Sequence, residues 1–195
     1  MAIEQAREIE QTPGRPYRFT VDAFQRMADV GIFEEGDRVE LLDGEIVVMN
    51  PISPGHSGRL RRILRILFRE LGERALLDAQ NPIQLRPRGQ PQPDIVALRP
   101  RADDYTTSHP TAADVLLLIE IADSSLARDR DTKARIYAQA GIPEYWIVNL
   151  VDSTLMVFRQ PANGLYRSEQ VLGSGDFVQP LAFPDASVTV AEIFG

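Results

Sequence analysis

Two carboxylates in strand-like segments are the residues of this sequence best suited to chemistry. Glu120 lies inside the apolar run "LLLIEIA", where an unpaired carboxylate would cost several kcal/mol. It must therefore be paired, protonated or bound to a cation. Asp94 opens the segment "DIVAL", which is typical of a second strand. Carboxylates on adjacent strands are the oxygen ligands that Mg²⁺ prefers, and the backbone carbonyl of Ile121 is placed to supply a third oxygen.

Lys133 is the only lysine, beside 20 arginines. In the helix predicted around it, Asp129, Lys133 and Tyr137 share one face, and the helix follows the Glu120 strand, so this face is expected to point inward. A compact ammonium whose pKa is lowered by burial would orient or deprotonate a metal-bound water. Two simpler interpretations are a buried Glu120–Lys133 salt bridge without a ligand, and an ammonium that reaches solvent.

Apolar periodicity predicts the elements that position these groups. Residues 19–32 read as a short helix capped by Thr20, and residues 38–49 as a hairpin that turns at Asp43-Gly44. Residues 53–78 have the apolar spacing of a long helix. Strands are expected at residues 79–89, 93–100, 114–122 and 143–150.

The remaining segments complete the predicted fold. Residues 124–142 read as a helix that ends at Gly141, and residues 153–195 as short strands and turns, the last of them in "ASVTVAEIF". The run "DVLLLIEIA" is apolar on both faces, which favours a central buried strand. This order predicts an α/β fold with a mixed sheet, as one domain over residues 17–195 behind a flexible arm at residues 1–16.

Composition excludes several functional classes. The chain has no cysteine, so disulfides and thiolate metal sites are ruled out and a cytoplasmic location is expected. It contains no apolar run long enough for a membrane span and no apolar core of a signal peptide. Neither GxGxxG nor GxxxxGK[ST] occurs, which argues against dinucleotide or P-loop chemistry.

The charge is unevenly distributed along the chain. The net charge of -7 argues against a general nucleic-acid binder, but residues 56–101 contain ten arginines against four acids, a local charge of +6. This stretch is either a surface that faces phosphates or the solvated face of a helix.

Four segments together resemble the Uma2-type endonucleases of the PD-(D/E)XK superfamily: "RVELLDGEIV", "PD" at 93–94, "LLLIEIADSS" and "RDTKARIYAQAGIPEYWIVN". The resemblance implies a restriction-endonuclease-like fold and hydrolysis of DNA phosphodiester bonds with Mg²⁺ or Mn²⁺. It makes Asp94 and Glu120 the metal-binding acids, with Glu40 completing the shell. Ala122 stands where the ExK signature has its lysine, so Lys133 is the candidate to supply the ammonium from the next helix.

The remaining assignments concern substrate and assembly. Tyr137 is expected to hold Lys133 or a phosphate, and His56, Arg59 and Arg62 to contact nucleic acid. Cleavage of both strands predicts a homodimer, because a duplex presents two phosphates related by a two-fold axis. The alternative is a non-catalytic binding or scaffold protein that keeps the nuclease fold, which the overall acidity and the missing ExK lysine favour.

Overall fold

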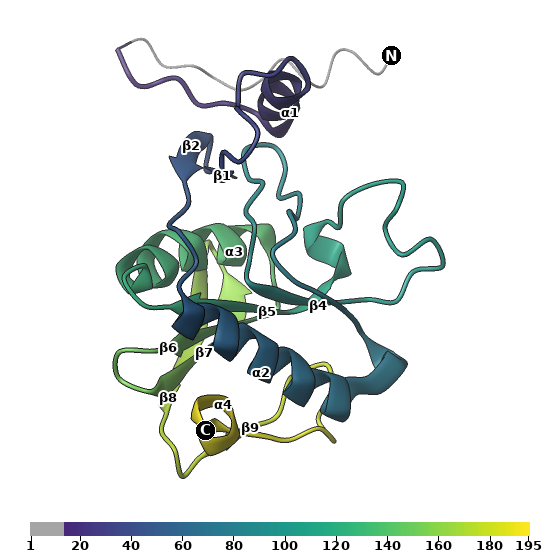
Figure 1. Cartoon of the computed structure of the whole chain (residues 1–195), viewed down its shortest axis with the longest axis vertical. Coiled ribbons are helices and arrows are strands. Elements are labelled where there is room, and N and C mark those ends of the chain that lie inside the picture. Colours follow the sequence, from purple (N-terminus) through teal and green to yellow (C-terminus); the bar gives the residue numbers. More distant parts are fainter. Residues whose placement is uncertain (1–13) are drawn as a thin grey trace.

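A six-stranded mixed sheet forms the centre of the computed structural model, which describes residues 14–195 (Figure 1). The order across the sheet is β3 (Leu76–Asp78), β4 (Ile95–Leu98), β5 (Val115–Ala122), β6 (Glu144–Asn149), β7 (Thr154–Ala162) and β8 (Leu165–Leu172). β5 and β6 are parallel, and every other neighbouring pair is antiparallel. The predicted mixed α/β sheet is thus confirmed. Most of the predicted arm, residues 1–13, lies outside the described residues, and the single domain at 17–195 stays a prediction.

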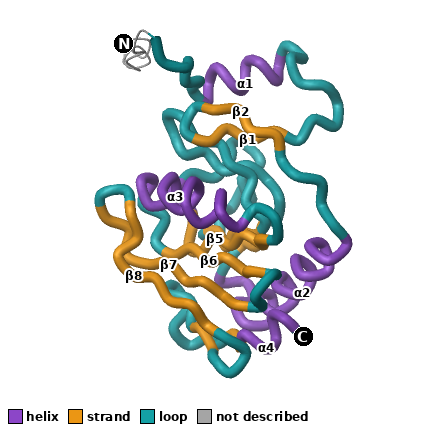
Figure 2. The backbone as a smooth tube through the Cα atoms, turned by 90° about the vertical axis from the view of Figure 1, so that its left-hand side faces the viewer, coloured by secondary structure: helices purple, strands orange, loops and turns teal. Residues whose placement is uncertain are grey.

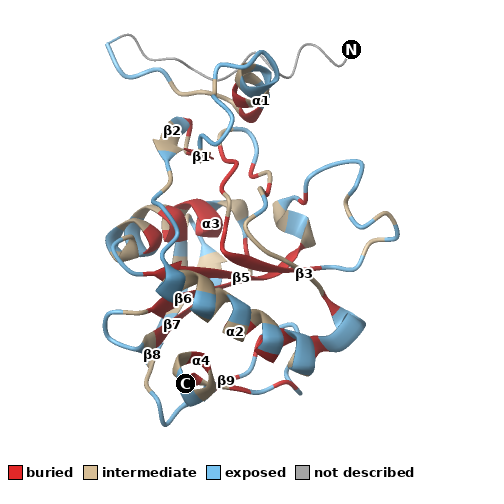
Figure 3. Ribbon diagram, in the orientation of Figure 1, coloured by how far each residue is buried: buried red, intermediate tan, exposed pale blue. Residues whose placement is uncertain are grey.

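Helices cover both faces of this sheet (Figure 2). On one face pack α2 (Pro54–Leu71) and the short α4 (Val190–Phe194), and on the other lies α3 (Ala134–Ala140). All eight residues of β5 are buried, as predicted for a central strand (Figure 3). Because side chains alternate along a strand, Ile119 and Ile121 join the α2 layer, and Glu120 points to the α3 layer.

A small substructure stands at one end of the sheet. It consists of α1 (Val21–Asp29) and the hairpin of β1 (Val39–Leu42) and β2 (Glu45–Val48) (Figure 1). Thr20 caps α1 by accepting the Ala23 N–H at 3.1 Å. Asp43 and Gly44 both have positive φ, as the two-residue hairpin turn requires. A Cβ at Gly44 would lie 2.8 Å from Cβ of Arg18, so this turn position needs glycine. Both predicted elements are confirmed.

Two predictions about residues 53–89 are wrong. The long helix ends at Leu71 rather than running to residue 78, because Gly72 takes φ 56° and a 3₁₀ turn follows over Gly72–Arg74. The chain then enters β3, whose residues pair with β4. Residues 79–89 form a loop with isolated bridges instead of a strand. Prolines at 82 and 87 cannot donate to a strand ladder, and Gln80 has positive φ.

The segments after β5 follow the prediction more closely. The predicted helix at 124–142 appears as a π-helical stretch over Arg128–Lys133 that continues as α3 and stops at Gly141, whose φ is 79°. β6 lies within its predicted strand, and β7 and β8 fall in the region at 153–195 predicted as short strands and turns, where they are longer than predicted, at nine and eight residues. The prediction fails at the end of "ASVTVAEIF", where Val188–Thr189 form β10, paired with β9 (Phe177–Val178), and the rest is α4. Thr189 and Glu192 cap that helix reciprocally.

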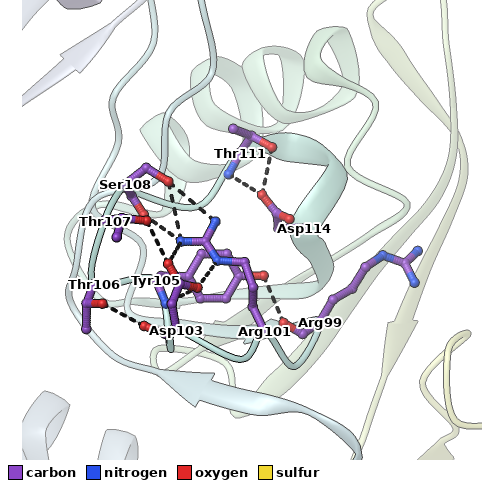
Figure 4. A network of polar contacts seen from close by, with 9 residues as sticks. All are labelled: Arg99, Arg101, Asp103, Tyr105, Thr106, Thr107, Ser108, Thr111 and Asp114. Carbon is purple, nitrogen blue, oxygen red and sulfur yellow. Dashed lines mark hydrogen bonds and ion pairs between the residues drawn. The ribbon is translucent and has the colours of Figure 1, made fainter.

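The polar loop before β5 is held by its own side chains (Figure 4). The Arg101 guanidinium pairs with Asp103 and stacks 3.8 Å from the centre of the Tyr105 ring. The Tyr105 hydroxyl donates to the Arg99 carbonyl at 2.8 Å, and Thr107 donates to Asp103 at 2.7 Å. Over residues 14–195, no helix combines the length and apolarity needed to cross a membrane.

Candidate active site

A cavity of about 360 Å³ opens where the hairpin, the start of α2, the segment before β4, β5 and the helix after β5 converge. Each of these elements contributes an ionisable side chain to its wall. They are Glu40 from β1, His56 from the first turn of α2, Asp94 just before β4, Glu120 from β5, and Asp129 and Lys133 from the π-helical stretch. The structure therefore brings together the two predicted acids, the lysine and the acid that the family resemblance added.

Lys133 lies between two buried carboxylates. Its Nζ is 3.0 Å from Oε1 of Glu120 and 3.1 Å from Oε2 of Glu40. Tyr137 donates its hydroxyl to the same Glu120 oxygen at 2.7 Å, and the Gln92 N–H donates to Oε2 of Glu40 at 3.2 Å. The second oxygen of each glutamate receives no hydrogen bond from residues 14–195. Both carboxylates thus keep one oxygen for another ligand.

Lys133 is held in its charged form. Burial by itself would lower the pKa of this ammonium, but the nearby carboxylates of Glu120, Glu40 and Asp129 outweigh burial and raise the pKa above its ordinary value. Three acids surround one amine, so its pKa is raised rather than lowered, which does not support the sequence-based expectation of a lysine that deprotonates water. Orienting a water or stabilising a developing negative charge remains open to it.

Burial raises the pKa of Glu120 well above its usual range, and the charge of Lys133 opposes that shift. Burial also raises the pKa of Asp129, with Lys133 and the Ser125 hydroxyl acting in the opposite direction. Ser125 donates to Oδ2 of Asp129 at 2.6 Å. This cluster of acids around one ammonium has more negative than positive groups, which favours the entry of a further cation.

Asp94 is oriented by the strand next to it. Its Oδ2 accepts the Ile121 N–H at 2.8 Å and lies 3.0 Å from Nε2 of His56. The hydrogen bond to Asp94 raises the pKa of His56, and burial opposes the increase. The N–H and C=O of a strand residue point to the same side, so the Ile121 carbonyl faces the side of the strand on which Asp94 lies. His56, which was expected to contact substrate, here contacts a carboxylate.

Asp129 is the site residue that sequence reasoning missed. It lines the cavity and is buried, one turn before Lys133 on the same helix face. The signal was present, because Asp129 shares the inward face with Lys133 and Tyr137, but an acid near the start of a helix is also common for reasons of the helix dipole. Arg38 and Arg128 line the cavity as well and were not singled out.

Arg59 and Arg62 point to the opposite layer. The Arg59 guanidinium contacts the Ile193 carbonyl and lies 5.2 Å from the centre of the Phe194 ring. Arg62 donates to the Glu192 carbonyl at 3.3 Å. Neither lines the cavity, and both hold α4 against α2. Their contact with nucleic acid stays a prediction that these interactions do not support. Tyr137 was expected to hold Lys133 or a phosphate, and its hydroxyl instead holds Glu120.

The oxygen donors fit a hard divalent cation in chemical type. Asp94, Glu120 and Glu40 offer carboxylate oxygens and Ile121 a carbonyl, which are the ligands Mg²⁺ prefers. Within residues 14–195, no group of three or more His, Cys, Asp or Glu side chains is arranged to hold a metal ion. A magnesium site here would use two carboxylates and the carbonyl, with water or substrate oxygens filling the remaining positions.

Comparison with known proteins found one matching family model and a solved structure of similar fold. A model of the Uma2 family, described as "Putative restriction endonuclease", matches residues 21–191. A crystal structure described as a "putative nuclease belonging to DUF820" from Anabaena variabilis ATCC 29413 is similar in fold, with a TM-score of 0.72 at 16% sequence identity. The similarity covers 90% of this chain and 97% of the other. Among curated proteins, none matches this chain significantly.

Proposed function

This chain belongs to the Uma2 family of restriction-endonuclease-like proteins, and we propose that it is a Mg²⁺-dependent endonuclease that hydrolyses phosphodiester bonds of DNA. The observation that supports this most is the meeting of Asp94, Glu120 and Lys133 in one cavity, on three segments that are separate in the sequence. A charged amine beside two oriented acids is the minimum that metal-assisted hydrolysis of a phosphodiester needs from protein side chains.

The proposed roles follow from the contacts. Asp94 and Glu120 would hold Mg²⁺ with the Ile121 carbonyl. Glu40, which pairs with Lys133, would complete the metal shell. When bound, the ion would supply an activated water and screen the scissile phosphate. Lys133, kept protonated by its carboxylate neighbours, orients that water or stabilises the charge that develops on the phosphate. Tyr137 positions Glu120, and His56 positions Asp94.

Two arginines at the cavity are the better candidates for contacts with the substrate. Arg38 and Arg128 both line it, and Arg128 makes no ion pair or hydrogen bond to any side chain of residues 14–195. A guanidinium matches the geometry of a phosphate and binds it without regard to base sequence. Arg38 already donates to the Asn50 carbonyl at 3.2 Å, which fixes its position at the rim.

Location and assembly complete the proposal. A chain without cysteine suits a reducing compartment, so we assign the activity to the cytoplasm. If both strands of a duplex are cut, a homodimer provides two sites related by a two-fold axis, as the two scissile phosphates are.

One observation favours a second function, that of a non-catalytic binding protein. Glu40 and Glu120 both pair with Lys133, so the ammonium has its counterions within a buried cluster without any ligand. Such a cluster can be a structural feature of the fold without any ligand.

A metal titration combined with plasmid nicking tests the two functions. For the nuclease, we expect calorimetry to show Mn²⁺ binding that Asp94→Asn and Glu120→Gln abolish, and both variants to lose nicking of supercoiled DNA by at least about 100-fold. The matched controls are Asp131→Asn and Glu73→Gln, two exposed acids away from the cavity wall, which should retain both properties. Absence of metal binding and nicking in the folded wild-type protein would favour the binding protein.

A further inference from the structure

The outer edge of β8 has no strand partner within residues 14–195. β8 is eight residues long and ends the strand order of the sheet, at whose margin it lies in Figure 2. An edge strand presents unpaired N–H and C=O groups, and proteins usually protect it by shortening it, by placing charged side chains, above all lysine, on it, or by adding proline. The opposite edge, β3, has only three residues, whereas β8 contains neither lysine nor proline.

The sequence of β8, "LYRSEQVL", is self-complementary about Ser168. Arg167 and Glu169, its two charged residues, flank that serine, and both are exposed. Leu165 and Val171 lie three positions from it on either side, with 57% and 60% of their surface exposed. No ion pair joins Arg167 or Glu169 to another side chain of residues 14–195. Each charge is therefore available to a partner outside the chain.

We propose that two copies of this chain associate by antiparallel pairing of their β8 strands about a two-fold axis at Ser168. In this register Arg167 faces Glu169 of the second copy, and Leu165 faces Val171 of the second copy. Two-fold symmetry makes each contact twice, so the interface holds two opposite-charge pairs between two apolar pairs. Opposite charges and apolar side chains directly across a strand pair both stabilise it.

The charges also specify the register. A shift by one residue would place Arg167 opposite Gln170 and Glu169 opposite Ser168, and both charge pairs would be lost. It would also pair each side chain with a side chain that points to the opposite face of the sheet. The pairing about Ser168 is thus the symmetric arrangement that satisfies both charged residues of β8. It joins the two six-stranded sheets into one continuous sheet.

This inference rests on the homodimer of the proposed function, but it does not depend on nuclease activity. The cavity is built on β5 and its neighbours, and no residue of β8 lines it. Association can be measured without metal or nucleic acid, so a monomeric wild type would remove the homodimer and leave the proposed hydrolysis to be decided by the nicking assay.

Charge reversal at the two positions provides a sharp test by analytical ultracentrifugation of the full chain. The wild type should sediment as a concentration-dependent dimer. Arg167→Glu and Glu169→Arg should each raise the dissociation constant by about tenfold or more, because symmetry converts both pairs to like-charge contacts. The double variant should restore the dimer, and an equimolar mixture of the two single variants should form a heterodimer. Arg61→Glu, an exposed reversal on α2, is the control and should leave the dimer intact.

Both residues are exposed, so the variants should fold, and circular dichroism with thermal melting checks this. A wild type that stays monomeric up to millimolar concentration overturns the proposal. So does a dimer that survives both single reversals, since β8 would then lie outside its interface. A dimer lost in the single variants and not restored in the double variant contradicts the register about Ser168.

Discussion

The Lys133 ammonium lies 3.0 Å from the Glu120 carboxylate, on two elements that follow each other in the chain. The same ammonium is shared with Glu40, which comes from a hairpin far away in the sequence. Three segments therefore set the charge of one buried cluster. The surrounding carboxylates raise the pKa of this ammonium against the effect of burial, which favours orientation and charge stabilisation as the roles of Lys133.

Removing the amine alone should destabilise the protein strongly. We expect Lys133→Met to lower the free energy of unfolding by about 3–5 kcal/mol, because two buried carboxylates lose their cation. The triple variant Glu40→Gln/Glu120→Gln/Lys133→Met should recover most of that loss, since no charge is left unpaired. Urea unfolding measures both, with the exposed Arg130→Met as control. A Lys133→Met protein as stable as wild type would show that the ammonium is not paired in solution.

Two buried tyrosines on the same face allow a matched comparison. Tyr137 donates to the Glu120 carboxylate at 2.7 Å, and Tyr145 donates to the Asp129 backbone carbonyl at 3.2 Å. A hydrogen bond to a charged group is stronger, so we expect Tyr137→Phe to cost about 1.5–3 kcal/mol and Tyr145→Phe about 0.5–1.5 kcal/mol. Chemical denaturation of the two variants gives the difference, and equal losses would argue that Glu120 is uncharged.

Glu144 forms a second buried ion pair, outside the cavity. Its carboxylate is fully buried and accepts from Arg159 at 2.6 Å, from the Trp146 indole at 2.9 Å and from the Leu181 N–H at 2.6 Å. Arg159→Met should therefore cost about 3–5 kcal/mol, because the glutamate stays behind without its cation. Arg69→Met, which removes an exposed pair with Glu70 and Glu192, should change stability little. Thermal melting of the two variants compares them directly.

The loop before β5 should be sensitive to acid. Hydrogen bonds from Thr107 and Arg101 lower the pKa of Asp103 to about 2. A lowered pKa means that the contribution of Asp103 to stability is present above its ordinary pKa of 3.8 and is lost as the pH falls through about 2. Carbon-detected NMR titration of the carboxyl group measures the midpoint. Thr107→Val should move the midpoint upward. An unchanged midpoint would show that the Thr107 hydrogen bond does not lower the pKa of Asp103.

The sequence by itself determined the local elements and their buried faces. The eight-residue run of β5, the inward face that carries Lys133, and the capped helix and hairpin before them all follow from periodicity and turn chemistry between near neighbours. The same patterns gave the wrong structure for residues 72–78 and 79–89. β3 is formed by pairing with β4, and the loop at 79–89 is held by isolated bridges, so neither could be seen in local spacing.

Only the tertiary structure decided how these elements meet. It brought Glu40 to the lysine, and it placed Arg59 and Arg62 against α4 rather than at the cavity. The direction of the Lys133 pKa shift likewise depends on how many carboxylates surround it, which is a sum over residues distant in the chain. Local spacing predicts which side a residue faces, but electrostatic energies depend on every charge that folding brings within a few ångströms.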